Sequence, residues 1–268
     1  MKRFNKILQD IKDVKIQGAK SVAIAGIKAY ILYPSKKSAK KIIETRSTEP
    51  LLQNAIKILK KSKNPKKDAE KFLKNLKKSQ EKIAKIGSTL IKNNTNIYVH
   101  CHSSTVMDLL KYAKKKRKKS FVVYTTEVEP LLQGHLTAKD LAKSKIKVII
   151  FPDLAAENAM KNCDLFLFGA DAYTKKSTIN KIGTSYLAQL SKIHKIPAYS
   201  CGVSKKFTKN RVKIEKRKPE EVWSIKNKNI DVQNPAFDKT PNKLLTGIIS
   251  EFGILKPKEF IKLARKNL

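Results

Sequence analysis

The sequence has little cysteine. Its three cysteines, Cys101, Cys163 and Cys201, are an odd and widely spaced set. Such a set cannot form the disulfide framework that stabilises small secreted domains, so we expect a reducing compartment, the cytoplasm. Residues 1–20 contain basic side chains but no uninterrupted apolar stretch, which is not the pattern of a secretory signal peptide.

Long apolar runs are also missing. The sequence contains no stretch of about 18 consecutive apolar residues, so we expect no membrane span. Hydrophobic residues still make up 41% of the 268 residues, which excludes a disordered composition. A chain of this length can build a substantial core in one large domain or two smaller ones.

Acidic residues and arginine are scarce beside lysine. The chain has 59 basic and 22 acidic residues, a formal charge of +37, yet its only arginines are Arg3, Arg46, Arg117, Arg211, Arg217 and Arg265. Proteins that read nucleic-acid bases rely mainly on arginine, and the lysines here are spread along most of the chain. A lysine-rich solvated surface therefore explains the charge better than a dedicated nucleic-acid site, although nonspecific attraction to polyanions is expected.

The first third of the chain has a helical pattern. In LLQNAIKILKKS (51–62) and EKFLKNLKKSQEKIAKIGSTLI (70–91), apolar residues recur with the spacing of one helix face. Pro34, Pro50 and Pro65 separate the helical stretches. These features predict a helical N-terminal domain over residues 1–95.

From residue 96 the pattern changes to short β-branched or aromatic runs that alternate with helical stretches. The runs are NIYVHC (96–101), SFVVYTT (120–126), IKVIIFP (146–152), DLFLFGA (164–170) and IPAYSC (196–201). Strands that alternate with helices of about 10–15 residues form a parallel sheet covered on both faces. We therefore predict an α/β fold, with a Rossmann-like, doubly wound parallel sheet over residues 96–268.

Parallel α/β sheets bind ligands outside the carboxyl ends of their strands. The residues expected there are Cys101 and His102, Thr125 to Glu127, Asp153, Gly169 to Asp171, and Cys201. Among them, Cys101 is a nucleophile-type side chain and Asp171 an acid–base side chain. The expected site is therefore in the crevice that holds these two residues.

Three interpretations of Cys101 remain open from the residues alone. It could be a small buried side chain, as free cysteines often are. It could bind a metal with His100 and His102, but alternate residues of a strand face opposite ways and no second cluster has zinc spacing. It could be a reactive group, which its place before the polar turn HSST favours.

The segment STINKIGTSYLA (177–188) predicts a polar loop that opens a helix, with Lys181 in the first helical turn. The free N–H groups at a helix N-terminus bind phosphate readily. An ordinary capped helix with an exposed lysine would give the same pattern.

The order of these motifs resembles one known family. VHCHSSTV, TTEVEPLLQGHLTAKDL, GADAY, INKIGTSYLA, SKKF and NIDVQNPAFDKTP follow one another along the chain. They resemble the family of ribose-1,5-bisphosphate isomerases, methylthioribose-1-phosphate isomerases and the alpha, beta and delta subunits of translation initiation factor 2B. The resemblance covers about residue 14 to the C-terminus, and within the family it is strongest to the archaeal ribose-1,5-bisphosphate isomerases.

The resemblance implies an aldose–ketose isomerase of a phosphorylated ribose, working in archaeal nucleotide salvage without a metal or organic cofactor. It implies catalytic roles for Cys101 and Asp171, which the regulatory subunits of the family lack. It also implies a homo-oligomer, either a dimer or a hexamer. The substrate-binding residues that it implies are Gly18, Ala19, Lys20, Arg46, Asn180 and Lys181.

The sequence departs from the isomerase pattern at two places. The substrate loop Arg-Gly-Ala-Gly reads Gln17-Gly18-Ala19-Lys20 here, and Glu129 stands where the isomerases have an arginine before a proline. A carboxylate at that position would repel a bisphosphate, and lysine lacks the bidentate fork of arginine. The alternative function is therefore a non-catalytic regulator that binds a phosphorylated ligand or a translation factor.

Overall fold

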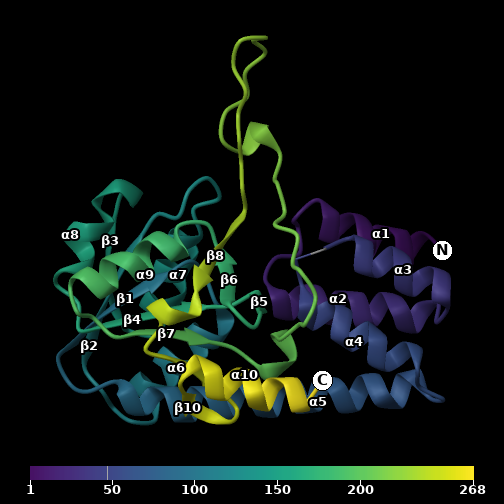
Figure 1. The fold of residues 1–268 in the computed structure, drawn as a ribbon, viewed down its shortest axis with the longest axis horizontal. Helices are drawn as coiled ribbons and strands as arrows, with labels where there is room; N and C mark the ends of the chain where they lie inside the picture. Colours follow the sequence, from purple (N-terminus) through teal and green to yellow (C-terminus); the bar gives the residue numbers. More distant parts are fainter. Residues whose placement is uncertain (47) are drawn as a thin grey trace.

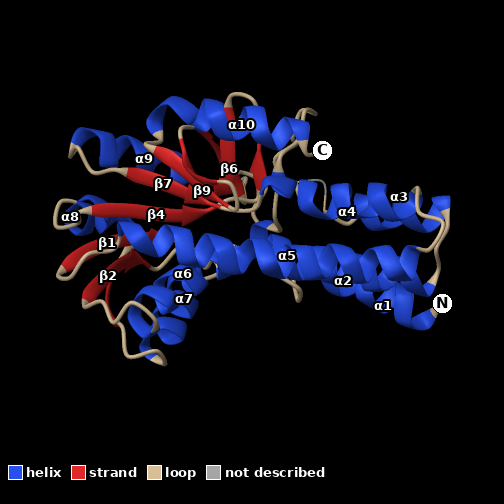
Figure 2. Cartoon of the chain, turned by 90° about the horizontal axis from the view of Figure 1, so that it is seen from below, coloured by secondary structure: helices blue, strands red, loops and turns tan. Residues whose placement is uncertain are grey.

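Five α-helices open the chain. A computed structural model describes residues 1–46 and 48–268, so Ser47, next to the expected substrate-binding residue Arg46, lies outside the described residues. The helices are α1 (Lys2–Lys12), α2 (Ala19–Leu32), α3 (Lys36–Glu44), α4 (Pro50–Lys60) and α5 (Pro65–Gly87). Proline at the first position starts α4 and α5, and the Asn64 side chain accepts a hydrogen bond from the Lys67 N–H at 3.1 Å. These helices form one end of the molecule, and α5 extends beneath the sheet (Figures 1 and 2).

A seven-stranded sheet forms the other end, and the alternating pattern predicted five of its strands. Its strands are β1 (Thr95–His100), β2 (Phe121–Thr126), β3 (Lys147–Phe151), β4 (Leu165–Gly169), β7 (Ala198–Cys201), β9 (Gly247–Ser250) and β10 (Gly253–Leu255). They lie in the order β10-β9-β7-β4-β1-β2-β3, and all neighbours are parallel except β10 with β9. The α/β class is confirmed, although β9 and β10 were not predicted.

Helices cover both faces of this sheet. They are α6 (Ser104–Lys115), α7 (Gln133–Ala142), α8 (Ala156–Met160), α9 (Thr184–Ile193) and α10 (Pro257–Lys266). Figure 2 shows α6 and α7 on one side of the strands and α9 and α10 on the other. Short 3-10 helices complete the connections: η1 (Ser88–Leu90), η2 (Asp153–Ala155), η3 (Ser204–Lys206), η4 (Pro219–Glu221) and η5 (Asn242–Leu244).

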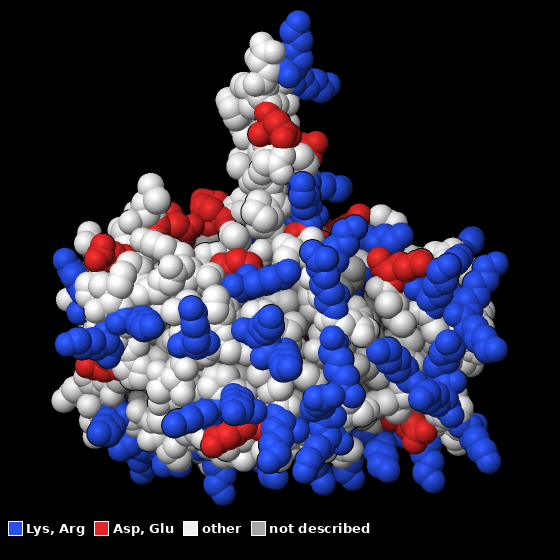
Figure 3. Space-filling model, in the orientation of Figure 1, with Lys and Arg blue, Asp and Glu red and all other residues white. Residues whose placement is uncertain are grey.

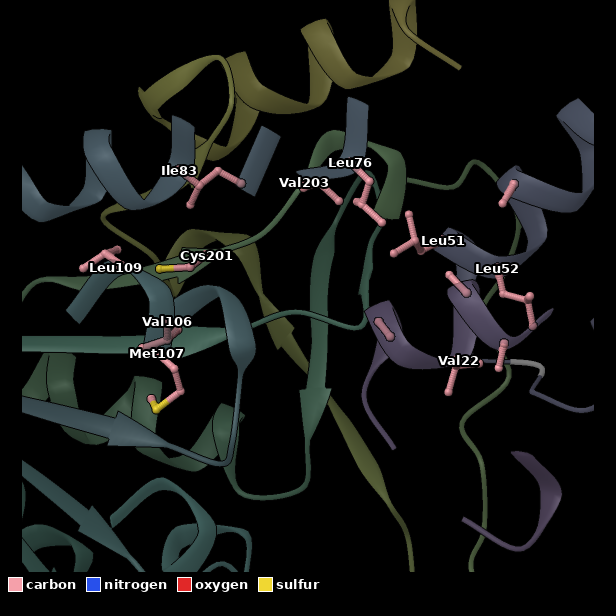
Figure 4. Close-up of a cluster of buried hydrophobic side chains, with 14 of the residues drawn as sticks. Val22, Leu51, Leu52, Leu76, Ile83, Val106, Met107, Leu109, Cys201 and Val203 are labelled. Carbon is pink, nitrogen blue, oxygen red and sulfur yellow. The ribbon is translucent and has the colours of Figure 1, made fainter. Parts of the chain in front are cut away.

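The alternation of side chains along the strands divides the core between the two faces. In β4, Leu165 and Leu167 pack into one cluster, whereas Phe166 and Phe168 pack into another with α8, α9 and α10. The first cluster continues into the N-terminal helices. Figure 4 shows side chains of α2, α4 and α5 beside those of α6 and β7. The division of the chain into domains at residue 95 stays a prediction.

A small antiparallel sheet lies beside the main one, and the sequence pattern did not predict it. It has the order β5-β6-β8, with β5 (Ala172–Tyr173), β6 (Ser177–Lys181) and β8 (Phe237–Pro241). Lys181 therefore ends a strand, and the helix begins only at Thr184. The expectation that Lys181 lies in the first turn of a helix was wrong, because pairing with β8 extends residues 177–181.

Between η3 and β8 the chain makes a long excursion that rises away from the body of the molecule (Figure 1). We call residues 209–235 of this excursion the projecting loop. An isolated β-bridge between Lys216 and Pro235 joins its two arms. Lysine and arginine are scattered over most of the visible surface, with a few acidic groups between them (Figure 3). This distribution agrees with a lysine-rich solvated surface, and nonspecific polyanion binding stays a prediction.

Candidate active site

The topology brings the ends of β1 and β4 together at the point where the strand order reverses. The chain runs from β1 to β2 and β3 on one side, and from β4 to β7 and β9 on the other. His100, the last residue of β1, pairs in register with Phe168 of β4. Cys101 follows β1 directly, and Asp171 follows β4 after one residue. This is the crevice in which open α/β sheets bind ligands.

A cavity of about 350 Å³ opens there, a volume suited to a small metabolite. All eight residues singled out as site residues line it: Gly18, Ala19, Lys20, Arg46, Cys101, Asp171, Asn180 and Lys181. Among the described lining residues, six carry a cation, namely Lys15, Lys20, Arg46, Lys181, Lys206 and Arg217, and Asp171 alone carries a carboxyl group. The cavity therefore favours an anionic ligand.

Cys101 has an unusual backbone conformation. Its φ of 64° lies in the left-handed region, which costs a residue with a Cβ on the order of 1–3 kcal/mol. The Thr137 hydroxyl of α7 donates a hydrogen bond of 3.0 Å to the Cys101 carbonyl and so holds this turn. Burial, with the nearby charge of Asp171, raises the pKa of the Cys101 thiol to about 12, although Lys181 opposes the shift. At neutral pH the thiol is therefore protonated.

Asp171 lies among buried charged groups. Burial raises the pKa of Asp171, while the ammonium of Lys206 and the guanidinium of Arg46 oppose the shift. Lys206 is itself almost fully buried, and its Nζ donates a hydrogen bond to the Ala170 carbonyl beside Asp171. Lys206 is thus a cation fixed at the aspartate, within the motif SKKF.

Glu49 lies near Asp171 and Arg46 and is completely buried. Burial, together with the charge of Asp171, raises the pKa of Glu49 from 4.5 to about 8, and Arg46 opposes this. Its Oε1 lies 3.6 Å from Arg46 Nη2. Glu49 does not line the cavity.

Arg46 reaches the cavity, but Glu215 partly compensates its charge. The Nε of Arg46 lies 3.2 Å from Glu215 Oε2. The other oxygen of Glu215 lies 3.0 Å from Nε of Arg217. Glu215 and Arg217 belong to the projecting loop, so this loop contributes one cation to the cavity wall and one carboxylate behind it.

Lys181 is the more available cation. Lys181 is buried. Burial lowers the pKa of its ammonium group, and the nearby Cys101 opposes that shift. Among the described residues its Nζ has no hydrogen-bond or ion-pair partner. The neighbouring Asn180 donates a hydrogen bond of 3.1 Å from Nδ2 to Thr184 Oγ1.

The N-terminus of α9 does not offer the phosphate site that the sequence suggested. Oδ2 of Asp238, in β8, accepts a hydrogen bond of 2.9 Å from the Ser185 N–H and therefore occupies this helix end. Asp238 lies more than fifty residues further along the chain, so no local pattern predicted it. The cationic group that faces the cavity at this corner is the side chain of Lys181.

The loop of residues 17–20, which the family resemblance implies binds substrate, lines the same cavity. Gly18 has a φ of 79°, a conformation that glycine adopts without strain, and it precedes α2. Gln17 and Lys20 both line the cavity, so the substitution of the family's arginine by Gln17 affects the site directly. Glu129 is exposed and does not line the cavity. The expected repulsion of a bisphosphate by Glu129 therefore has no support in the geometry.

Several other strand-end residues lie outside the cavity. Asp153 accepts hydrogen bonds from the N–H groups of Val128 and Glu129, at 2.9 and 2.8 Å, and so fixes the loop after β2. Cys201 is buried in the core. His102, expected at the end of the first strand, lines the cavity, and lining residues that sequence reasoning did not select include Ser103, Gln133, Lys206, Arg217 and Phe237. The turn HSST and the segment SKKF signalled some of them, but Arg217 had no signal.

Within residues 1–46 and 48–268, no group of three His, Cys, Asp or Glu side chains is placed to hold a metal ion. In the same part of the chain, no helix combines the length and the apolarity that crossing a membrane requires.

The sequence and the fold were compared with those of known proteins. The family model described as "Initiation factor 2 subunit family" matches residues 15–257. "Ribose 1,5-bisphosphate isomerase" of Methanocaldococcus jannaschii is 33% identical, over 93% of this chain and 90% of that protein. A "Putative translation initiation factor eIF-2B subunit 2-like" protein of Pyrococcus furiosus is also 33% identical, over 94% and 96%. A crystal structure of the Pyrococcus horikoshii translation initiation factor eIF-2B superposes with a TM-score of 0.88 at 27% identity, covering 97% of this chain and 99% of that one.

Proposed function

The chain belongs to the initiation factor 2 subunit family, and on that basis we propose that it is an aldose–ketose isomerase of a phosphorylated ribose. The proposed reaction converts ribose 1,5-bisphosphate to ribulose 1,5-bisphosphate. The observation that carries the proposal is the meeting of Cys101 and Asp171 in one cavity with six cationic side chains. Curated relatives named ribose 1,5-bisphosphate isomerase support the substrate class.

The reaction makes three demands on the site. Opening the sugar ring breaks the C1–O4 bond and requires a proton for O4. One hydrogen moves from C2 to C1, so that C2 is oxidised and C1 is reduced. Forming the C2 carbonyl requires removal of the proton from the C2 hydroxyl. No electrons enter or leave, so the chemistry consists of positioned proton transfers.

Cys101 and Asp171 fit the first two demands, which are the protonation of O4 and the transfer of a hydrogen from C2 to C1. The Cys101 thiol is protonated at neutral pH and can act as the acid at O4. Burial raises the pKa of Asp171 while Lys206 and Arg46 oppose the shift; in its ionised form Asp171 can take the hydrogen of C2 as a proton and return it to C1. Lys20, Lys181 and the other cations of the cavity would bind the two phosphates.

The decisive experiment is an isomerase assay on the purified protein with ribose 1,5-bisphosphate. We expect ribulose 1,5-bisphosphate to form, and Cys101→Ser to slow its formation by about 100-fold or more, because the hydroxyl is a much weaker acid. Cys163→Ser is the matched control, since Cys163 lies outside the cavity. Full turnover by Cys101→Ser would refute this mechanism.

The alternative function is a non-catalytic regulator. Two observations favour it: Gln17 replaces an arginine in the cavity wall, and the charge of Arg46 is partly compensated by Glu215. A regulator would bind a sugar phosphate or a translation factor without converting any pentose phosphate. Its binding would be indifferent to Cys101→Ser.

We also infer the setting of this activity. The unpaired state of Cys101, Cys163 and Cys201 supports a reducing, cytoplasmic location. The role that we propose for this isomerase is a step of archaeal nucleotide salvage, as the resemblance implies. The protein would act as a homo-oligomer, a dimer or a hexamer, which light scattering on the purified protein would measure.

A further inference from the structure

His102 follows Cys101 and lines the same cavity, and its hydrogen bonds determine which of its nitrogens carries a proton. Its Nδ1 lies 3.1 Å from Thr137 Oγ1, and the same oxygen lies 3.0 Å from the Cys101 carbonyl. A carbonyl can only accept, so the single hydroxyl proton of Thr137 is donated to Cys101. Thr137 must then accept from His102, and Nδ1 carries the proton.

This arrangement leaves the other ring nitrogen as a free base. Nε2 of His102 has no hydrogen-bond partner among the described residues, and it is not among their buried unpaired atoms. Burial lowers the pKa of His102, and the nearby Asp140 and Lys111 act in opposite directions. These two form an ion pair of 2.7 Å, so their charges largely cancel at the imidazole. The ring is therefore neutral at pH 7.

Apart from His102, the described part of the site lacks a group that could remove the proton from the C2 hydroxyl of the substrate. The Cys101 thiol is protonated and serves as an acid, and Asp171 exchanges the carbon-bound hydrogen. The remaining lining side chains with ionisable groups are lysines and arginines, which are cations at neutral pH. His102 is the neutral base among the described residues of the cavity wall.

We propose that His102 is a third catalytic residue of this site, whose Nε2 takes the proton from the substrate hydroxyl on the carbon that becomes the ketone. The inference rests on the proposed isomerase function and deepens it. The Thr137 hydroxyl is the positioning group, because it holds both the Cys101 carbonyl and the His102 ring.

The proton balance of the cycle closes with this assignment. Cys101 gives its proton to the ring oxygen and becomes a thiolate. Asp171 takes one proton from C2 and returns one to C1. The C2 hydroxyl gives its proton to Nε2 as the C2–O bond becomes a carbonyl. The imidazolium of His102 then returns a proton to the thiolate of Cys101, which restores both groups for the next turnover.

The first test reads the tautomer without reference to activity. In the full-length protein labelled with ¹⁵N-histidine, long-range ¹H–¹⁵N NMR spectra at pH 7 distinguish a protonated from an unprotonated ring nitrogen. The His102 signals, assigned by comparison with His102→Asn, should show a protonated Nδ1 and an unprotonated Nε2. A protonated Nε2 would overturn the proposal.

The second test separates the base from the hydrogen bond to Thr137. In His102→Asn the amide nitrogen can still donate to Thr137, but no base remains at the position of Nε2. We expect kcat to fall by about 100-fold or more, while KM changes by less than about threefold. If His102 only held Thr137 in place, His102→Asn would keep its turnover, and that result would overturn the proposal.

The control is His194→Asn, because His194 is remote from the cavity and its Nε2 lies 3.0 Å from Glu157 Oε1. It should keep the wild-type kcat. A loss in His194→Asn equal to that in His102→Asn would make the effect nonspecific and overturn the assignment. A wild-type protein without turnover would instead refute the isomerase function, and the role of His102 with it.

Discussion

Replacement of the buried Glu49 by glutamine should shift the difference in stability progressively in favour of the variant as the pH rises. The pKa of Glu49 is about 8 in the folded protein, against 4.5 when the chain is unfolded. Because the folded value is the higher one, Glu49 contributes its full stability below pH 4.5, and this is lost as the pH rises towards 8. The amide introduced by Glu49→Gln does not titrate, so the variant would not lose stability in this way.

The magnitude follows from the two pKa values. Between pH 4.5 and 8 the unfolded chain releases the proton of Glu49 while the folded protein retains it. The unfolding free energy of the wild type relative to Glu49→Gln should therefore fall by about 1.4 kcal/mol per pH unit, or about 3 kcal/mol by pH 7. Loss of the contact with Arg46 adds a constant offset within this range, without changing the slope.

The assay is urea denaturation of both proteins at a series of pH values between 4 and 9. The control is Glu44→Gln, because Glu44 is exposed and its ion pair among residues 1–46 and 48–268 is a surface contact of 4.0 Å with Lys40. Its difference from the wild type should be flat with pH. A flat difference for Glu49→Gln as well would show that Glu49 is ionised in the folded protein, and would refute the reasoning about the buried charge cluster.

Three further substitutions test the site. Asp171→Asn should lower kcat by about 100-fold or more, and combining it with Cys101→Ser should cost far less than the product of the two losses; fully multiplicative losses would show that the two groups act independently. Lys181→Ala should weaken sugar-phosphate binding by about tenfold or more in calorimetry, because a charge-assisted hydrogen bond is lost; unchanged affinity would remove Lys181 from the site. Gly169→Ala should reduce both turnover and melting temperature, since its Cβ would lie 2.6 Å from Ser103 Oγ. Wild-type behaviour of that variant would mean that the turn after Cys101 can shift freely.

Five strands of the main sheet, β1 to β4 and β7, could be predicted from the sequence because their signal is local, whereas β9 and β10 were not predicted. Each strand from β1 to β4 is a short apolar run, and the predicted boundaries differ from the observed ones by at most one residue. The position of the crevice could be predicted from the same information, because the carboxyl ends of parallel strands lie at one edge of the sheet. Cys101 and Asp171 could therefore be assigned to one site before any coordinates.

The parts that sequence reasoning missed depend on partners far apart in the chain. The segment 177–181 is polar and looks like a loop, but it pairs with Phe237–Pro241 and becomes a strand. Asp238 occupies the end of α9 for the same reason. The pairing of Arg46 with Glu215 joins residues almost 170 positions apart. No periodicity or motif within a short window contains such information.

The hydrophobic cluster that runs from the N-terminal helices into the sheet also determines how the protein can unfold. Ile83 of α5 lies in one cluster with Leu109 of α6 and Cys201 of β7 (Figure 4). A chain that began at β1 would expose this face of the sheet to water, and the isolated helices would lose the surface on which α5 rests. The N-terminal helices and the sheet, which both line the cavity, therefore belong to one cooperative unit. Local unfolding that separates the helices from the sheet must also disrupt the site.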